Sequence, residues 1–168
     1  MLSSDYIVGL TDGEGSFCVF IRKPEKSTWN ARVECHFYIK MRDDELPLLR
    51  KVKDFFRCGR ISFQKEYRKN QKNNYRYQVS NLRDLSNIII PFFRKNKLLS
   101  IPRRRDFSLF CNIVRLVNGE KHKKQVGLKK IQRLKSKMHQ WGSPYAGNPH
   151  VRSLSQRKLA GIPTAKAV

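Results

Sequence analysis

Two stretches of alternating side chains near the N-terminus constrain the fold of this chain more than any other feature. From Ser16 to Lys23, and again from Asn30 to Lys40, an apolar residue recurs at every second position. In the longer stretch the apolar positions are Val33, Cys35, Phe37 and Ile39, and the positions between them are Arg32, Glu34, His36, Tyr38 and Lys40. A period of two is typical of a strand with one buried face. Both stretches therefore predict strands with an apolar core face and a polar, basic outer face.

The remaining periodicities predict a second pair of strands and several helices. Strands are expected over Arg60–Arg68 and Asn74–Ser80, joined by a polar turn over residues 69–73. Helices are expected over Asp44–Phe56, Leu82–Phe93, Arg103–Val117 and Val126–Trp141, after a first helix that begins at Asp5, is capped by Ser4 and is stopped by Gly13 and Gly15. This order predicts an α+β domain with helices on one face of a four-stranded antiparallel sheet.

Charge is the second strong constraint. The chain has 36 Lys and Arg against 13 Asp and Glu, for a formal net charge of +23. So many positive side chains repel one another unless a polyanion binds. The composition therefore predicts a nucleic-acid partner. A membrane partner is disfavoured, because the sequence has no long apolar run and no isolated amphipathic anchor.

The basic residues are distributed unevenly along the chain. Residues 1–90 contain 17 basic and 11 acidic side chains, whereas residues 91–168 contain 19 and 2. From Gly142 onward the sequence is rich in Ser, Pro, Gly and isolated basic residues without periodicity. We therefore expect one folded domain over residues 1–142, followed over residues 143–168 by a basic C-terminal tail or an arm that orders on DNA.

The cysteines and the N-terminal residues bear on the compartment. Cys18, Cys35, Cys58 and Cys111 stand far apart without a CxxC pair, which argues against a zinc ribbon and a disulfide framework. We expect them to be small core residues in a reducing compartment. The first ten residues have neither the apolar stretch of a signal peptide nor the Arg-rich pattern of a transit peptide. We expect an intracellular protein, encoded by a bacterium or inside a chloroplast or mitochondrion.

The first predicted helix contains the residues that point to chemistry. Gly9 and Gly13 are one helical turn apart, so a second backbone can approach this side of the helix. Glycine in a helix costs about 1 kcal/mol relative to alanine, which close packing would offset. Glu14 lies at the C-terminal end, where the helix dipole disfavours an anion and a metal cation would stabilise it. On spacing alone, an amphipathic helix with capping glycines and a solvated Glu14 is an equal alternative.

The same segment carries a resemblance to a known family. Residues 7–15 read IVGLTDGEG and match the LAGLIDADG motif position by position, and Ser16 and Phe17 open the following strand. The likeness continues in FYIKMRDDELPLLRKVKDFFRCGRI and in IPRRRDFSLF, and it extends over roughly residues 4–142. The chain therefore resembles the LAGLIDADG homing endonucleases, of the type that has one motif per chain and acts as a homodimer.

This resemblance implies an αββαββα core with extra C-terminal helices, in which two motif helices pack at a dimer axis and two sheets form a saddle over DNA. It implies a site-specific endonuclease that cuts double-stranded DNA at a long pseudo-palindromic site and serves intron or gene homing. Glu14 is implied as the catalytic metal ligand, helped by the Gly13 carbonyl, with Mg²⁺ as the ion and Ca²⁺ or Mn²⁺ as substitutes. The implied dimer interface contains Tyr6, Gly9, Leu10 and Gly13. Asp12 is expected to be structural.

Two further positions bear on catalysis. Arg103 is the implied basic residue beside the scissile phosphate, expected just before the fourth helix, with Arg104 and Arg105 as neighbours. The alternative is a solvated basic helix start, although the helix dipole disfavours cations there. Some family members hold a polar residue after the second strand, where this chain has Met41. That part of the water network is then absent or is supplied by Lys40 or Arg42.

The polar strand faces supply the residues predicted to read DNA. They are Arg22, Arg32, Glu34, His36, Tyr38 and Lys40 from the first strand pair and Ser62, Gln64, Glu66, Arg68, Asn74, Arg76 and Gln78 from the second. A two-stranded ribbon fits the major groove, where Arg reads guanine and Asn or Gln reads adenine. A solvated outer face is the alternative for about a third of these positions. Lysines between residues 121 and 137, among them Lys123 and Lys124, are expected to contact phosphates.

The sequence is also compatible with other functions. The same fold could serve as an RNA-binding maturase that acts on intron RNA, or as a DNA-binding protein that no longer cleaves, but the joint presence of Glu14 and Arg103 favours the enzyme. The glycine spacing and the paired polar strand faces argue against a generic ribosome-associated protein. An HNH-type nuclease finds no support, because His122, His139 and His150 have no partners at ligand spacing and are expected on the surface.

Overall fold

The structure, a computed structural model, describes residues 2–22, 31–67 and 72–139. In chain order its elements are α1 (Ser4–Glu14), β1 (Gly15–Arg22), β2 (Arg32–Arg42), η1 (Asp43–Glu45), α2 (Leu46–Phe56), β3 (Arg60–Gln64), β4 (Asn74–Val79), α3 (Leu82–Asp84), η2 (Leu85–Ile89), α4 (Ile90–Lys95), α5 (Ile101–Asn118), η3 (Lys121–Lys123) and α6 (Gln125–Ser136). The predicted α+β class is confirmed, as is the predicted order of elements.

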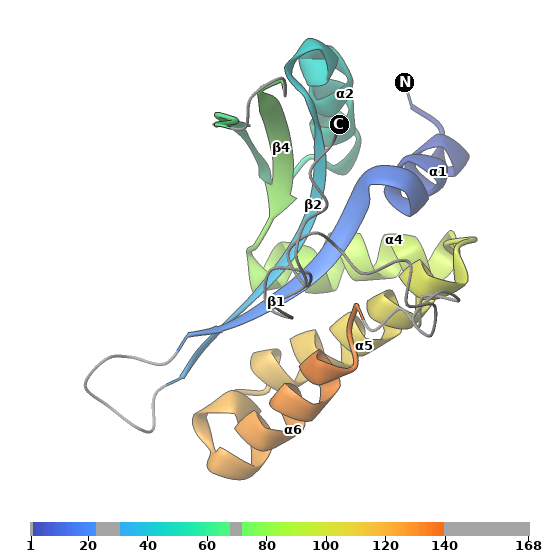
Figure 1. The fold of residues 1–168 in the computed structure, drawn as a ribbon. Coiled ribbons are helices and arrows are strands. Elements are labelled where there is room, and N and C mark those ends of the chain that lie inside the picture. Colours follow the sequence, from blue (N-terminus) through green and yellow to red (C-terminus); the bar gives the residue numbers. More distant parts are fainter. Residues whose placement is uncertain (1, 23–30, 68–71, 140–168) are drawn as a thin grey trace, which may run out of the picture.

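The four strands form one sheet in the order β1-β2-β4-β3, and all neighbouring strands are antiparallel. Figure 1 shows β1 and β2 as a long hairpin, with α5 and α6 side by side. The register pairs Phe17 with Phe37 and Phe37 with Val79. Odd-numbered strand residues therefore share the face that the helices cover, which we call the core face. Even-numbered residues share the opposite face, which we call the polar face.

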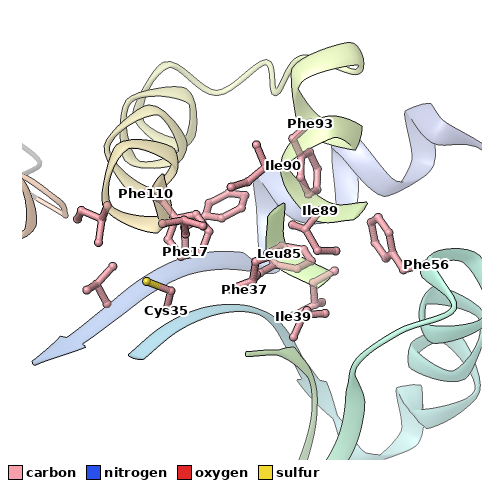
Figure 2. Close-up of a cluster of buried hydrophobic side chains, with 14 of the residues drawn as sticks. Phe17, Cys35, Phe37, Ile39, Phe56, Leu85, Ile89, Ile90, Phe93 and Phe110 are labelled. Atoms are coloured by element: carbon pink, nitrogen blue, oxygen red, sulfur yellow. The ribbon is translucent and has the colours of Figure 1, made fainter. Parts of the chain in front are cut away.

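Aromatic rings join the sheet to the helices (Figure 2). Phe17 of β1 stacks on Phe37 of β2 with ring centroids 5.2 Å apart, and it also meets Phe110 of α5 at 5.3 Å. Phe37 contacts Phe93 of α4 at 5.4 Å. These four side chains are buried, and burial of each stabilises the fold by roughly 1.5–3 kcal/mol. The alternation in the two N-terminal strands therefore predicted the core face correctly.

Several element ends differ from the predicted ones. Ser3 caps α1, because its side chain accepts the Tyr6 N–H, so the expected cap at Ser4 is wrong by one residue. The strand expected to reach Arg68 ends at Gln64, and the Glu66 N–H is bonded to the side chain of Asn73 instead of to a neighbouring strand. Arg68 lies outside the described residues.

The helical half of the chain shows two further differences. The helix expected over Leu82–Phe93 widens into a turn of π-helix, η2, just before Pro91, a residue that has no N–H to donate to the previous turn. The helix expected to reach Trp141 ends at Ser136, because the chain turns at His139 (φ 56°) and the His139 N–H donates to Asp106 Oδ1 at 3.0 Å.

Other expectations also fall on residues that the structure does not describe: most of the turn over residues 69–73, His150, and the tail over residues 143–168. In the described ranges, no helix combines the length and the apolar character that a membrane crossing requires.

Candidate active site and nucleic-acid interface

The first helix has a buried side and an open side. Ile7, Val8 and Thr11 are buried, whereas Gly9 and Gly13 are exposed. A Cβ atom added to either glycine would meet nothing within 4 Å. The packing of this chain on itself therefore does not explain why glycine occupies these positions.

The predicted interface residues Tyr6 and Leu10 differ in their surroundings. Tyr6 is 46% exposed and lies on the open side with Gly9 and Gly13. Leu10 is partly buried and packs against the core of its own chain. The structure therefore leaves Tyr6 and the glycines, more than Leu10, available to a partner.

Asp12 ties the end of α1 to the start of α5. Its Oδ2 atom accepts hydrogen bonds from the backbone N–H groups of Leu99 at 2.7 Å and Ser100 at 3.2 Å. Ser100 in turn caps α5, because its side chain accepts the Arg103 N–H. Asp12 thus has the structural position that the sequence predicted.

Arg103 lies in the first turn of α5, two residues after the helix begins, and not before the helix as expected. Its Nε donates to the carbonyl of Asp12 at 3.3 Å and its guanidinium donates to the carbonyl of Gly13 at 3.4 Å. The first turn of a helix disfavours a cation, but the C-terminal carbonyls of α1 carry partial negative charge and offset this. Arg104 and Arg105 are exposed.

Glu14 opens into a pocket of about 430 Å³ that we call the Glu14 pocket. Its other lining residues are Lys40, Met41, Arg42, Glu45 and Asn74. Arg42 is held by Asp44 through two contacts, at 2.7 and 3.2 Å. Met41 packs against the core at the edge of the pocket. Lys40 and Arg42 were the two residues expected to order water where this chain has Met41 and some family members have a polar residue. Lys40 is therefore the less constrained of the two.

The oxygen atoms at this end of α1 suit a hard cation. The Glu14 carboxylate and the Gly13 carbonyl are oxygen donors of the type that Mg²⁺ and Ca²⁺ prefer. Among the described residues, no group of three or more His, Cys, Asp or Glu side chains is placed to hold a metal. The residues fit a divalent ion only if further ligands come from outside this chain.

The register gathers the predicted reading residues into rows on the polar face. Lys40 of β2 is opposite Arg76 of β4, and Arg76 is opposite Ser62 of β3. The next row holds Arg42, Asn74 and Gln64. At the other end of the hairpin, Arg22 is opposite Arg32.

Partners within the chain restrict some of these side chains. Glu34 forms ion pairs with Arg32 at 3.1 Å and Arg22 at 3.4 Å, and its carboxylate lies 3.7 Å from His36 Nε2. Burial lowers the pKa of His36, although Glu34 opposes this shift. His36 is therefore neutral at neutral pH, so one ring nitrogen can donate and the other can accept.

Arg76 and Gln78 show the two extremes of the central strand. The Arg76 guanidinium lies over the Tyr38 ring at 4.5 Å, while its Nε is buried and has no hydrogen-bond partner among the described residues. Gln78 faces the same way but is only 8% exposed, between Tyr38 and Arg60 on the neighbouring strands. The expectation that Gln78 reads DNA is therefore weakened, because its side chain has little open surface.

Other predicted contact residues lie off the sheet. Glu66 follows the end of β3, and its carboxylate accepts the Tyr67 N–H. Lys123 and Lys124 lie in the connection between α5 and α6, where Lys123 pairs with Glu120. His139 was expected on the surface, and it is exposed, but its Nδ1 also lies 2.9 Å from Asp106 Oδ2. The sequence pattern did not indicate this pairing, because it depends on a turn after α6.

Sequence reasoning also missed residues that the fold places near these sites. Ser16 and Arg60 lie on the polar face, in one row with Tyr38 and Gln78. Their even positions in the predicted strands could have identified them. Leu99 and Ile101 are 78% and 72% exposed, next to the segment that Asp12 holds. No periodicity marks these two apolar residues.

Known proteins resemble this chain in sequence. The model of the family described as LAGLIDADG endonuclease matches residues 7–114. The chain is 32% identical over 142 residues to "Probable intron-encoded endonuclease 2" of Neurospora crassa, a match that covers 84% of this chain and 30% of that protein. It is 30% identical over 167 residues to "Homing endonuclease I-ApeII" of Aeropyrum pernix, which covers 99% of this chain and 94% of that protein.

Solved structures resemble it in fold. I-SmaMI, crystallised with an uncleaved DNA target in the presence of calcium ions, superposes with a TM-score of 0.74 at 31% identity. The match covers 86% of this chain and 47% of that one. The chain thus spans about half of the I-SmaMI chain and less than a third of the Neurospora relative, but nearly all of the Aeropyrum one.

Proposed function

The chain belongs to the LAGLIDADG endonuclease family, and on this premise we propose that it is a site-specific endonuclease that cuts double-stranded DNA as a homodimer. One observation carries the proposal above all. The guanidinium of Arg103 lies against the carbonyl of Gly13, 90 residues away in the sequence, directly beside Glu14. This contact supports a joint role in cleavage for Arg103 and Glu14, since Gly13 is the residue that precedes Glu14 at the end of α1.

The proposed homodimer interface lies on the open side of α1. Gly9 and Gly13 leave space that their own chain does not use, so a second α1 can approach backbone to backbone. Tyr6, Leu99 and Ile101 are exposed apolar side chains that such an interface would bury. A two-fold axis at α1 would set the two Glu14 residues close together and would favour a pseudo-palindromic target.

Glu14 and Gly13 are the residues that we propose to hold a divalent ion, Mg²⁺ in the cell with Ca²⁺ or Mn²⁺ as substitutes. When bound, such an ion would act as a Lewis acid toward the scissile phosphate. The partner's copy of this end of the helix and the DNA backbone would complete the ligands that one chain lacks. Arg103 then stabilises the negative charge that develops on the phosphate. Lys40 orients water in the Glu14 pocket, where Met41 cannot.

The polar face is the proposed DNA-binding surface. Arg32, Lys40 and Arg76 can donate hydrogen bonds to base edges. The side-chain amides of Asn74 and Gln64 can both donate a hydrogen bond to adenine and accept one from it. The net charge of +23 supplies affinity for phosphates. Lys123 and Lys124 and the basic residues 143–168 are proposed to add contacts of this sequence-independent kind.

The relatives' names support a role in intron or gene homing, since the Neurospora protein is called intron-encoded and the Aeropyrum protein a homing endonuclease. We propose that the chain acts inside the cell, in the compartment that holds its gene. A maturase function toward intron RNA is the alternative on the same fold, and it would not require cleavage.

Cleavage of a randomised palindromic DNA library tests the proposal. The purified chain is incubated with the library and Mg²⁺, and the cut ends are sequenced. We expect cuts at one long two-fold site that disappear with EDTA. Tight binding without cleavage by a folded dimer, with Mg²⁺, Mn²⁺ and Ca²⁺ each tried, would contradict the endonuclease and favour a binding protein.

A further inference from the structure

Cys18 differs from the other cysteines in its place in the sheet. The sequence predicted a core role for all four, and for Cys18 this is wrong, because its even position in β1 turns the thiol to the polar face, opposite His36 in the register. The thiol is half-buried. Its Sγ lies 3.3 Å from the Ser16 hydroxyl and 3.7 Å from the Tyr38 hydroxyl. The Cys18 thiol donates to the Tyr38 hydroxyl, and either atom of the pair with Ser16 can be the donor.

An imidazole and a carboxylate line up behind this thiol. His139 Nε2 lies 3.9 Å from Cys18 Sγ, and His139 Nδ1 lies 2.9 Å from Asp106 Oδ2. The Asp106 side chain is 4% exposed, and its second oxygen accepts the backbone N–H of His139. Asp106 thus contacts both the ring and the backbone of His139, and the Nε2 atom of that ring lies on the side of the sulfur.

We propose that Cys18 is a nucleophilic thiol and a modification site, activated by the His139 imidazole that Asp106 orients, and that small electrophiles such as peroxides are its reaction partners. An imidazole beside a thiol can take its proton, and the resulting thiolate is the nucleophile. The three groups come from β1, the turn after α6 and α5, so the arrangement exists only in the folded chain.

The other three thiols lack this arrangement. Burial raises the pKa of Cys35 to about 12 and that of Cys111 to about 11. Burial also raises the pKa of Cys58, whose neighbours include Tyr77 and Asp84. Since the thiolate is the reactive form, these three cysteines react slowly at neutral pH.

The reaction with hydrogen peroxide illustrates the chemistry. The Cys18 thiolate attacks one peroxide oxygen, so an S–O bond forms as the O–O bond breaks. Sulfur is oxidised by two electrons and the peroxide is reduced. The departing hydroxide takes a proton from the His139 imidazolium and leaves as water, and a sulfenic acid remains on Cys18.

The consequence for DNA rests on the proposed function. Cys18 lies on the polar face, one strand from His36 and Tyr38, where we propose that DNA binds. An oxidised or alkylated sulfur there would displace base or phosphate contacts. Modification should therefore weaken DNA binding, and bound DNA should shield the thiol.

Timed alkylation of the full chain with iodoacetamide, followed by mass spectrometry of each cysteine, tests the proposal. We expect Cys18 to react at least about tenfold faster than Cys58, which is also half-buried, and His139→Asn to slow Cys18 by about tenfold. Asparagine suits this position because it tolerates the positive φ. Cys35 serves as the fold control, since it is buried and labels only if the chain opens.

Equal rates at Cys18 and Cys58 in the unaltered chain would overturn the proposal, and this comparison needs no variant. An unchanged Cys18 rate in His139→Asn, with Cys35 still protected, would overturn the role of His139. Peroxide treatment should weaken DNA binding by the unaltered chain and leave binding by Cys18→Ser unaffected. If Cys18 reacts fast but bound DNA does not slow the reaction, Cys18 is a reactive thiol as proposed, and the proposed DNA-binding face is wrong.

Discussion

The two faces of the sheet differ in where their partners come from. On the core face, Phe17 and Phe37 meet rings from α4 and α5, so the contacts are complete within one chain. On the polar face, the Arg76 Nε is buried without a hydrogen-bond partner in the part of the chain that is described. At the edge of that face, the described residues include no group of three or more metal-binding side chains around Glu14. The core face thus makes its contacts within one chain, whereas the described part of the chain leaves groups on the polar face without partners.

The largest effect should come from the core face. Phe37→Ala removes a ring that packs on Phe17, Phe56, Tyr77 and Phe93, and it should lower the free energy of unfolding by about 3–5 kcal/mol. Arg76→Ala, the matched change on the polar face, should lower it by less than about 1 kcal/mol while weakening DNA binding. Urea denaturation measures both. Similar losses of stability in Phe37→Ala and Arg76→Ala would show that both faces contribute equally to stability.

Arg103→Ala should have the next largest effect, on cleavage. Without the guanidinium beside the Gly13 carbonyl, the cleavage rate at saturating DNA should fall by about 10²–10³-fold, as when other transition-state donors are removed. Arg105→Ala, an exposed neighbour in the same helix, is the control and should change the rate little. A loss of DNA affinity as large as the loss of rate would instead make Arg103 a binding residue.

The open side of α1 gives a prediction in which stability and assembly move in different directions. Gly9→Ala should stabilise the monomer by up to about 1 kcal/mol, because a Cβ meets nothing there and alanine favours the helix. Gly9→Leu should weaken dimerisation by at least about tenfold, since it separates the two backbones. Sedimentation equilibrium measures the dissociation constant of the dimer, and thermal unfolding measures the stability of the monomer. A dimer of unchanged affinity in Gly9→Leu would place the interface elsewhere.

The smallest effect should separate two basic residues of the Glu14 pocket. Lys40→Gln should slow cleavage by about tenfold. Lys40 is the basic side chain best placed to order water in the pocket, a role that some family members give to a polar residue at the position of Met41. Arg42→Gln should slow it less, because Arg42 is already held by Asp44. Single-turnover rates on one cognate DNA compare them. The reverse order would assign the water-ordering role to Arg42.

The sequence predicted most of the fold because periodicity reports which side of each strand is buried. The alternation from Val33 to Ile39 located the core face, and the helical spacing between Leu46 and Phe56 located α2. Element ends were less predictable, since Ser3 and Ser4 are equally good caps and only the packing of α1 selects between them. The end of α6 depends on Asp106, a contact with a residue 33 positions away.

The candidate site was predicted unevenly for the same reason. The motif predicts Glu14 and Gly13 from a local pattern, and their role stays a prediction. That Arg103 bonds the carbonyls of Asp12 and Gly13 follows from how Asp12 holds the segment before α5, which no local pattern contains. The burial of Gln78 also depends on its neighbours across the sheet.

Cleavage and binding by Glu14→Gln test the central claim most directly. The substitution keeps the shape of the side chain and removes the charge that a divalent ion requires, at an exposed position that contributes little to the core. Affinity for cognate DNA is measured in EDTA, and cutting is then started with excess Mg²⁺. We predict that cleavage is abolished while specific binding is kept within a few-fold. Cleavage at an ordinary rate, or a loss of binding as severe as the loss of cutting, would contradict the proposed metal role of Glu14.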